Sequence, residues 1–171
     1  QPAEEGQGGA TKMLSDGLFQ KFPCDEIYGI HNDPNGKNGE IGICKGKAMA
    51  GAAIFDINID GIGSHAAMPH QTKDPIVAAG MVTAALQTLV SRQLDPFDHA
   101  VISLTKLEAG SAFNVIPDIA TVGGTLRTMK KTTRKDFLQQ IETVAQTAAC
   151  VTGCEVSMEV RPGYPPTINH E

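Results

Sequence analysis

The sequence contains no tryptophan, and aromatic residues make up only 5% of its 171 positions. It also lacks an excess of positive charge, because 14 Lys and Arg residues stand against 19 Asp and Glu, for a formal net charge of -5 at pH 7. Nucleic-acid-binding domains usually carry a basic stripe, often with aromatic side chains that stack on bases. Since the sequence has no such stripe, its composition argues against a nucleic-acid partner.

No uninterrupted apolar run approaches the roughly 20 residues that a membrane-spanning helix needs, so we expect no membrane partner. The amino end does not resemble a signal peptide and opens at Gln1 inside a candidate motif, so we expect a chain whose natural beginning is missing. The cysteines have no Cys-x-x-Cys spacing, which favours thiols in a reducing cytoplasm over zinc sites or disulfides. They are Cys24, Cys44, Cys150 and Cys154.

Hydrophobic periodicity divides the chain into three segments. Residues 53–162 follow the order strand, helix, strand, strand, helix, strand, because alternating apolar residues give way twice to helical spacing. That order predicts a ferredoxin-like α+β sandwich, with two helices on one face of a four-stranded antiparallel sheet. The other face and an edge should stay uncovered, and proteins often hide such surfaces by dimerising. Residues 1–52 and 163–171 then look like one piece of an interrupted domain, expected to be part of a doubly wound α/β domain, into which the sandwich is inserted.

Some single elements can also be predicted. A short helix is expected at Ala10–Asp16, and strands are expected at 26–31, 41–44 and 47–50, the last two as a pair. In the first sandwich helix, apolar residues recur every four positions, which predicts one buried face. This face contains Val77, Met81, Ala85 and Leu89.

Two adjacent carboxylates, Glu4 and Glu5, stand between Pro2 and three glycines. Proline stiffens the approach and glycine allows a sharp turn, so both side chains can be held near one point. Like charges this close repel each other unless a cation lies between them. A divalent metal would resolve the repulsion, with one carboxylate as its ligand and the other as a general base. The alternative is a solvated acidic turn without a function.

Four further residues are candidates for chemistry. His31 lies at the carboxyl end of a predicted strand, where α/β sheets bind ligands, so it is a candidate metal ligand; packing or capping is the alternative. His65 stands among small residues that leave its ring accessible, which suits a donor to a developing oxyanion; a loop histidine without a role is the alternative. Asn114 and Arg127 are ambiguous singly, although an arginine fork matches a substrate carboxylate.

These pieces form a series of motifs, QPAEEGQGGA, GIHNDP, GSHAAMPH followed by DPI, AFNVIPDIATVGGTLRT and YPPTIN. Over essentially its entire length the chain resembles the hippurate hydrolase and indole-acetyl-amino-acid hydrolase branch of the zinc aminoacylase and carboxypeptidase superfamily. The resemblance implies a metal-dependent amidohydrolase that cleaves N-acyl amino acids such as hippurate. It also implies that Glu4 is the general base and that Glu5 and His31 are metal ligands. Other branches carry an aspartate at the position of His31, which favours this branch.

The same resemblance implies a homodimer formed through the sandwich, the family's lid or dimerisation domain. His65 and Asn114 would then reach the active site of the other subunit, and Arg127 would help to hold the substrate carboxylate. A metallo-dipeptidase or carboxypeptidase of the same superfamily, or a dimerisation module without catalysis, are the alternatives.

The sequence departs from the family in its metal ligands. The upstream Cys or His motif and the late His that complete the family's ligand set have no counterpart here. Two ligands cannot close a divalent site, which needs about four donors. We therefore expect the chain as given to be inactive and to bind zinc or manganese weakly or not at all.

Overall fold

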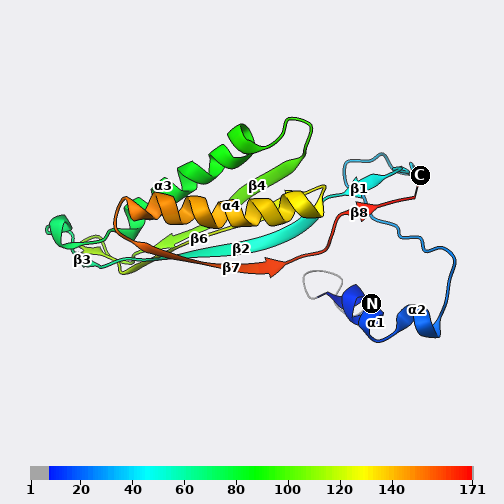
Figure 1. Cartoon of the computed structure of the whole chain (residues 1–171), viewed down its shortest axis with the longest axis horizontal. Helices are drawn as coiled ribbons and strands as arrows, with labels where there is room; N and C mark the ends of the chain where they lie inside the picture. The colour runs from blue at the N-terminus through cyan, green and yellow to red at the C-terminus, as the bar shows by residue number, and fades with distance from the viewer. Residues whose placement is uncertain (1–7, 171) are drawn as a thin grey trace. The chain divides into compact units, whose positions relative to one another are not determined.

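A computed structural model of the chain describes residues 8–170, which fall into two units (Figure 1). The described part of the first unit is residues 8–45, and the second unit is residues 46–170. The domain boundaries that the sequence places at residues 52 and 162 stay predictions.

The described part of the first unit contains two short helices, α1 (Gly9–Ser15) and α2 (Leu18–Lys21), and α1 confirms the expected first helix. Residues 22–45 contain neither helix nor strand, so the predictions of strands at 26–31 and 41–44 are wrong for this structure. The physical reason is that a strand needs partners for its backbone groups, and the described part of this unit supplies none. The apolar side chains of these segments are therefore exposed; they include Ile27, Tyr28, Ile30, Ile41 and Ile43.

The second unit is the predicted ferredoxin-like sandwich. Its four long strands form one antiparallel sheet in the order β4-β6-β2-β7, and helices α3 and α4 cover one face of that sheet (Figure 1). In chain order the elements are β2 (Gly51–Asp60), α3 (Pro75–Thr88), β4 (Ala100–Ala109), β6 (Ile119–Thr128), α4 (Lys131–Cys150) and β7 (Glu155–Pro162). A π-helical turn, η2 (Leu89–Gln93), continues α3. The α+β class, the four-stranded antiparallel sheet and the order of helices and strands along the chain, all predicted from the sequence, are confirmed.

The core lies between the sheet and the two helices. Phe55, Ile57 and Ile59 of β2 are fully buried on the helix side, while Asp56 and Asn58 between them face the other side. This alternation follows from the two-residue period of a strand. From the helices, the core receives mainly Ala78, Val82, Leu86, Leu89, Phe137, Ile141 and Ala145.

The predicted buried face of α3 is partly wrong, because Val77 and Met81 are 51% and 37% exposed. Leu89 is buried as expected. The helix is apolar around most of its circumference, so a four-residue spacing does not single out the face that packs. Residues Pro75–Gln93 also have the length and apolar composition of a membrane-spanning helix, but their buried side chains belong to the sandwich core. We therefore assign this helix to the core.

The sheet face that carries no helix is largely polar, although Ile54 and Ile119 on it are exposed. Asp56 forms an ion pair with Arg161 across neighbouring strands, and Thr121 Oγ1 donates to Asn58 Oδ1 at 3.4 Å. A sheet of this kind can keep one face in water. The prediction that one sheet face stays uncovered is confirmed. Because this face carries mainly polar side chains, it can remain in contact with water.

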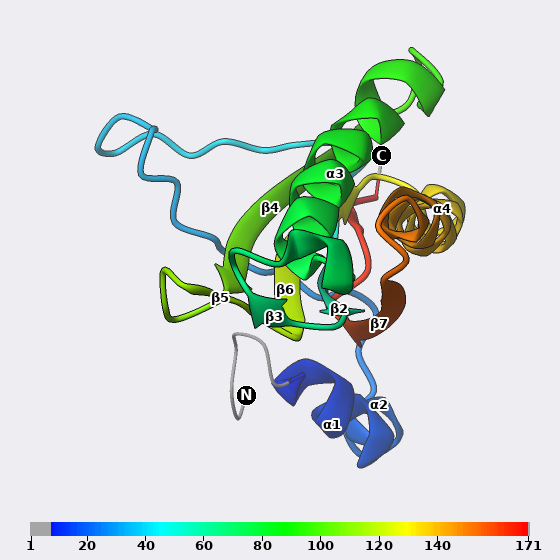
Figure 2. The same cartoon turned by 90° about the vertical axis from the view of Figure 1, so that its left-hand side faces the viewer.

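Two small ribbons lie at opposite ends of the sandwich (Figures 1 and 2). At one end, β3 (Ser64–His65) pairs with β5 (Val115–Ile116), followed by the 3-10 turn η1 (Pro69–Gln71). At the other end, β1 (Lys47–Met49) pairs with β8 (Thr167–Ile168). The sequence instead predicted that residues 47–50 pair with 41–44. We call the first ribbon, with the loop that follows it, the tip. We call residues 46–52, which include the first two residues of β2, and residues 163–169 the connecting arm.

Candidate active site

The tip brings His65 and Asn114 together although 48 positions separate them in the sequence. His65 is opposite Val115 in the β3–β5 ladder, and the Ala66 amide donates to the Asn114 carbonyl at 3.0 Å. Gly63 makes this approach possible, because a Cβ at its position would lie 2.4 Å from the carbonyl oxygen of Ile116. His65 on β3 and Asn114 in the turn directly before β5 therefore lie on neighbouring backbone segments.

The His65 ring is held in one tautomer. The backbone amide of Ala67 donates to its Nδ1 at 3.1 Å, so in the neutral ring the proton is on Nε2. The surrounding turn is fixed as well, since the Met68 amide donates to the His65 carbonyl at 2.8 Å. His65 and Asn114 are both exposed. The exposed Nε2–H of His65 and the exposed carboxamide of Asn114 can each donate a hydrogen bond to an oxygen that is gaining negative charge.

Asp118 also shapes the tip, and the sequence did not mark it as important. Its carbonyl accepts from the Gly61 amide and its carboxylate Oδ1 accepts from the Gly63 amide, both at 2.8 Å. The sequence feature that could have pointed to Asp118 is its position as an acidic residue directly after Pro117, within the motif that contains Asn114.

Arg127 lies at the opposite end of the sheet. It is opposite Ala52 on β2 and Val101 on β4, next to the connecting arm, whereas the tip adjoins the Ile119 end of β6. Eight residues along a strand span about 26 Å. Its side chain is exposed and has no hydrogen bond or ion pair with the residues that the structure describes. The sandwich therefore separates Arg127 from His65 and Asn114.

His31 belongs to the first unit and has the opposite tautomer to His65. Its Nδ1 lies 2.8 Å from the Asn32 carbonyl oxygen, which can only accept, so Nδ1 carries the proton and Nε2 keeps its lone pair. Metal-bound histidines commonly donate their second ring nitrogen to a carbonyl in this way. The exposed ring of His31 thus fits a metal ligand.

A complete metal site is not assembled by the part of the chain that the structure describes. Glu4 and Glu5, the predicted base and ligand, lie outside the described residues. Within residues 8–170, no three His, Cys, Asp or Glu side chains gather closely enough to hold an ion. Of the predicted metal ligands, His31 is therefore the one that lies among the residues the structure describes.

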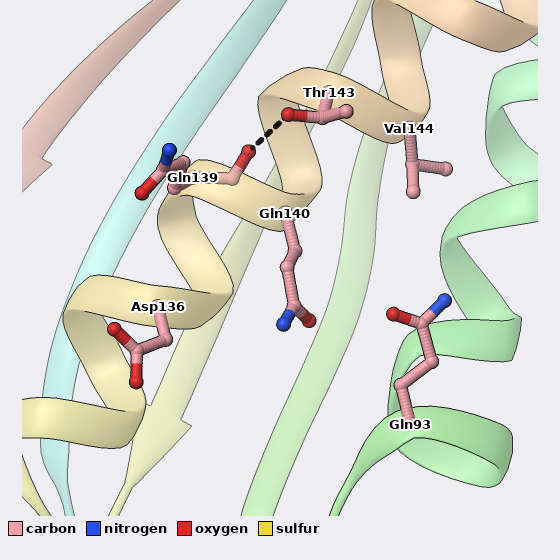
Figure 3. Close-up of a pocket in the computed structure, with 6 residues that line it drawn as sticks. All are labelled: Gln93, Asp136, Gln139, Gln140, Thr143 and Val144. Carbon is pink, nitrogen blue, oxygen red and sulfur yellow. Dashed lines mark hydrogen bonds between the residues drawn. The ribbon is translucent and has the colours of Figure 1, made fainter.

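A pocket of 560 Å³ on the helix layer does not resemble a hydrolytic site (Figure 3). Amide, hydroxyl and aliphatic side chains dominate its wall, with Asp136 as the one carboxylate. Thr143 donates to the Gln139 carbonyl at 3.0 Å, so part of that polarity is already used within α4. None of the predicted site residues lines it.

The chain enters and leaves the sandwich through a paired, two-stranded arm. Residues 48–151 match the family model described as the peptidase dimerisation domain of the M20 family. The chain belongs to the M20 peptidase family.

Known proteins of this family resemble the whole chain. It is 40% identical over 171 residues to a hippurate hydrolase from Campylobacter jejuni, covering 100% of this chain and 45% of that protein. It is 40% identical over 173 residues to the IAA-amino acid hydrolase ILR1-like 4 from Arabidopsis thaliana, covering 99% of this chain and 39% of that protein. The chain thus spans less than half the length of these relatives. The resemblance found in the motifs is confirmed.

A solved structure from Bacillus subtilis, described as a dinuclear metal binding peptidase from the M20 family, has the same fold with a TM-score of 0.74. The identity is 35%, and the match covers 99% of this chain and 41% of that one.

Proposed function

We propose that this chain is part of a metal-dependent amidohydrolase that cleaves the amide bond of N-acyl amino acids. The observation that carries the proposal is the exposed pair of His65 and Asn114, with the His65 proton on Nε2, in a chain of this family. The names of the two relatives both describe hydrolysis of an acyl group joined to an amino acid. The substrate class follows from those names and from the predicted carboxylate partner, Arg127.

The cofactor we propose is a divalent cation, zinc or manganese, with Glu5 and His31 among its ligands. The free Nε2 lone pair of His31 supports this role. A bound cation would polarise the scissile carbonyl and lower the pKa of water. The described residues do not by themselves gather a donor set for the ion.

The roles we propose for the chain's own residues are those that the family resemblance implies. Glu4 accepts a proton from the attacking water and later passes it to the leaving nitrogen. The Nε2–H of His65 and the carboxamide of Asn114 donate hydrogen bonds to the oxygen that becomes negative in the transition state. The guanidinium of Arg127 pairs with the substrate carboxylate and so orients the acyl group.

Two copies of the chain are needed for these roles to meet on one small substrate. His65 and Asn114 lie at the tip, and Arg127 lies about 26 Å along β6 from the tip end of that strand. One sandwich cannot bring both groups to the same molecule. We therefore propose a homodimer. In it, the tip of one subunit, with His65 and Asn114, completes an active site to which the partner subunit contributes its Arg127.

The surface we assign to this dimer is the outer face of α3 with the free edge of β4. Ile76, Val77 and Met81 are 46%, 51% and 37% exposed on one side of α3. An exposed apolar patch of this kind usually marks a protein interface. β4 is an edge strand, so its unpaired backbone groups can pair with a second copy. The matching family model, a dimerisation domain, supports this assignment.

A substrate panel tests the proposed reaction. The whole protein, loaded with zinc or manganese, should hydrolyse hippurate, indole-acetyl amino acids or N-acetyl amino acids, and a chelator should abolish the activity. Hydrolysis of dipeptides in preference to all N-acyl amino acids would instead identify a dipeptidase or carboxypeptidase. Absence of hydrolysis on the entire panel, in a protein that still dimerises, would identify a dimerisation module.

A further inference from the structure

The connecting arm consists of two segments, and hydrogen bonds join them directly beside the sheet. The Ala52 amide donates to the Tyr164 carbonyl at 3.0 Å, and the Gly163 amide donates to the Ala52 carbonyl at 3.1 Å. Further along, the segments pair again as β1 and β8. The arm is therefore a narrow ribbon through which the sandwich joins the rest of the chain.

The ribbon is interrupted between these two paired parts. Pro165 and Pro166 have no amide hydrogen and so cannot donate a ladder bond. The segments still touch, because a Cβ on Gly51 would lie 2.7 Å from Cδ of Pro166. Contact without hydrogen bonds makes this point the place where the arm can most easily bend.

Arg134, in the first turns of α4, bridges both segments on the sandwich side of this point. Its Nη1 lies 3.2 Å from the Ala52 carbonyl oxygen and 3.2 Å from the Tyr164 carbonyl oxygen. The side chain is half-buried, and hydrogen bonds from a charged donor are stronger than those between neutral groups. One guanidinium thus holds the same two carbonyls that close the ribbon.

The first turn of α4, which carries Arg134, is itself held in place. Asp98 accepts from Lys130 Nζ at 2.6 Å and from Thr133 Oγ1 at 3.0 Å, which ties the start of α4 to the loop before β4. The Lys130 hydrogen bond is the main reason that the pKa of Asp98 is lowered, and the charge of Lys47 on β1 contributes. Figure 1 shows that α4 begins at the end of the sheet from which the arm extends.

We propose that Arg134 is a positioning residue that fixes the direction in which the connecting arm leaves the sandwich. The consequence for catalysis rests on the proposed function: the direction of the arm sets where the tip, with His65 and Asn114, stands relative to the site it completes. A lysine at position 134 would keep a charged donor, whereas a methionine would keep only the length of the side chain.

The test uses residual dipolar couplings and amide exchange on the 171-residue chain, without metal or substrate. In the natural sequence, couplings from β1 and β8 should fit the same alignment tensor as those from β2 and β6. In Arg134→Met the arm should need a separate tensor, and exchange at Ala52 and Gly163 should quicken roughly 10- to 100-fold. Arg134→Lys should restore part of both effects.

Arg161→Met is the matched control, because it also removes an arginine from the second unit but one that pairs with Asp56 on the open face. It should leave the arm unchanged. An arm that fits one tensor equally well in Arg134→Met and in the natural sequence would overturn the proposal. Lost protection of the core amides of Ile57 and Val122 in Arg134→Met would also overturn it, since the residue would then act on global stability. Both readouts are independent of any enzyme activity, so they can fail while the proposed reaction holds.

Discussion

The backbone amide of Ala67 donates a hydrogen bond to Nδ1 of His65 at 3.1 Å, two residues back along the chain. His31 shows the reverse arrangement, because its Nδ1 donates to the Asn32 carbonyl. The chain therefore holds one histidine as a donor through Nε2 and the other as a lone-pair ligand through Nε2. These are the two roles that an oxyanion contact and a metal contact require.

The tautomers can be measured directly. At a pH where the rings are neutral, ¹⁵N chemical shifts and long-range ¹H–¹⁵N couplings should report His65 protonated on Nε2 and His31 protonated on Nδ1. The physical reason is that an amide can only donate and a carbonyl can only accept. His70, which lies in the η1 turn and outside the β3–β5 ladder, serves as the internal comparison. A His65 spectrum with the proton on Nδ1 would contradict the oxyanion role.

Replacing His65 should affect turnover far more than replacing its neighbour His70. In the whole protein, loss of one oxyanion donor typically lowers kcat by 10²- to 10³-fold, or about 2.7 to 4 kcal/mol. His65→Ala should show a loss of this size with little change in KM, and His70→Ala should stay close to the natural enzyme. Equal losses in both variants would remove the assignment of His65.

A charge on the outer face of α3 should separate the dimer. Met81 is 37% exposed in an apolar patch, so Met81→Glu would place a carboxylate in the proposed interface. Sedimentation velocity should then show a monomer whose circular dichroism is unchanged. Ser157→Glu, on the open sheet face of β7, is the control and should remain dimeric. A dimer that tolerates Met81→Glu would place the interface elsewhere.

The stability of the sandwich should fall in acid through Asp98. The hydrogen bond from Lys130 lowers the pKa of this carboxyl, so it binds protons more weakly in the folded than in the unfolded chain. Its contribution is therefore fully present above the unfolded pKa of about 4 and is lost as the pH falls through the lower, folded value. Urea midpoints of Asp98→Asn should depend less on pH between about 5 and 2 than those of the natural chain. Glu155→Gln, an exposed carboxylate, should show the natural dependence.

The sequence was enough to predict the sandwich, because its strands and α4 bury one face only. Phe55, Ile57 and Ile59 alternate with polar residues, which identifies a strand with one buried face. Phe137 and Ile141 recur at helical spacing, which identifies the buried face of a helix. Helix α3 was harder. Its apolar residues surround it, and the face chosen from spacing includes Val77 and Met81, which the structure exposes.

Long-range contacts marked the limit of the sequence interpretation. The spacing of residues 26–31 and 41–44 suits strands, but strands form only where partners exist, and none is supplied within the described part of the first unit. The pairing of β1 with β8 joins segments about 120 positions apart, and no local pattern specifies it. Arg134 carries no motif either, because its importance comes from two backbone carbonyls that only the fold brings within reach.

The exchange of active-site residues between subunits can be tested by mixing two inactive variants of the whole protein. Glu4→Gln removes the proposed base and keeps the tip, while His65→Ala removes the donor and keeps the base. If His65 serves the partner's site, dissociation and reassociation of the mixture should restore up to about a quarter of the natural activity, because half of the dimers are mixed and each holds one intact site. No recovery, in a mixture shown to contain mixed dimers, would contradict the account.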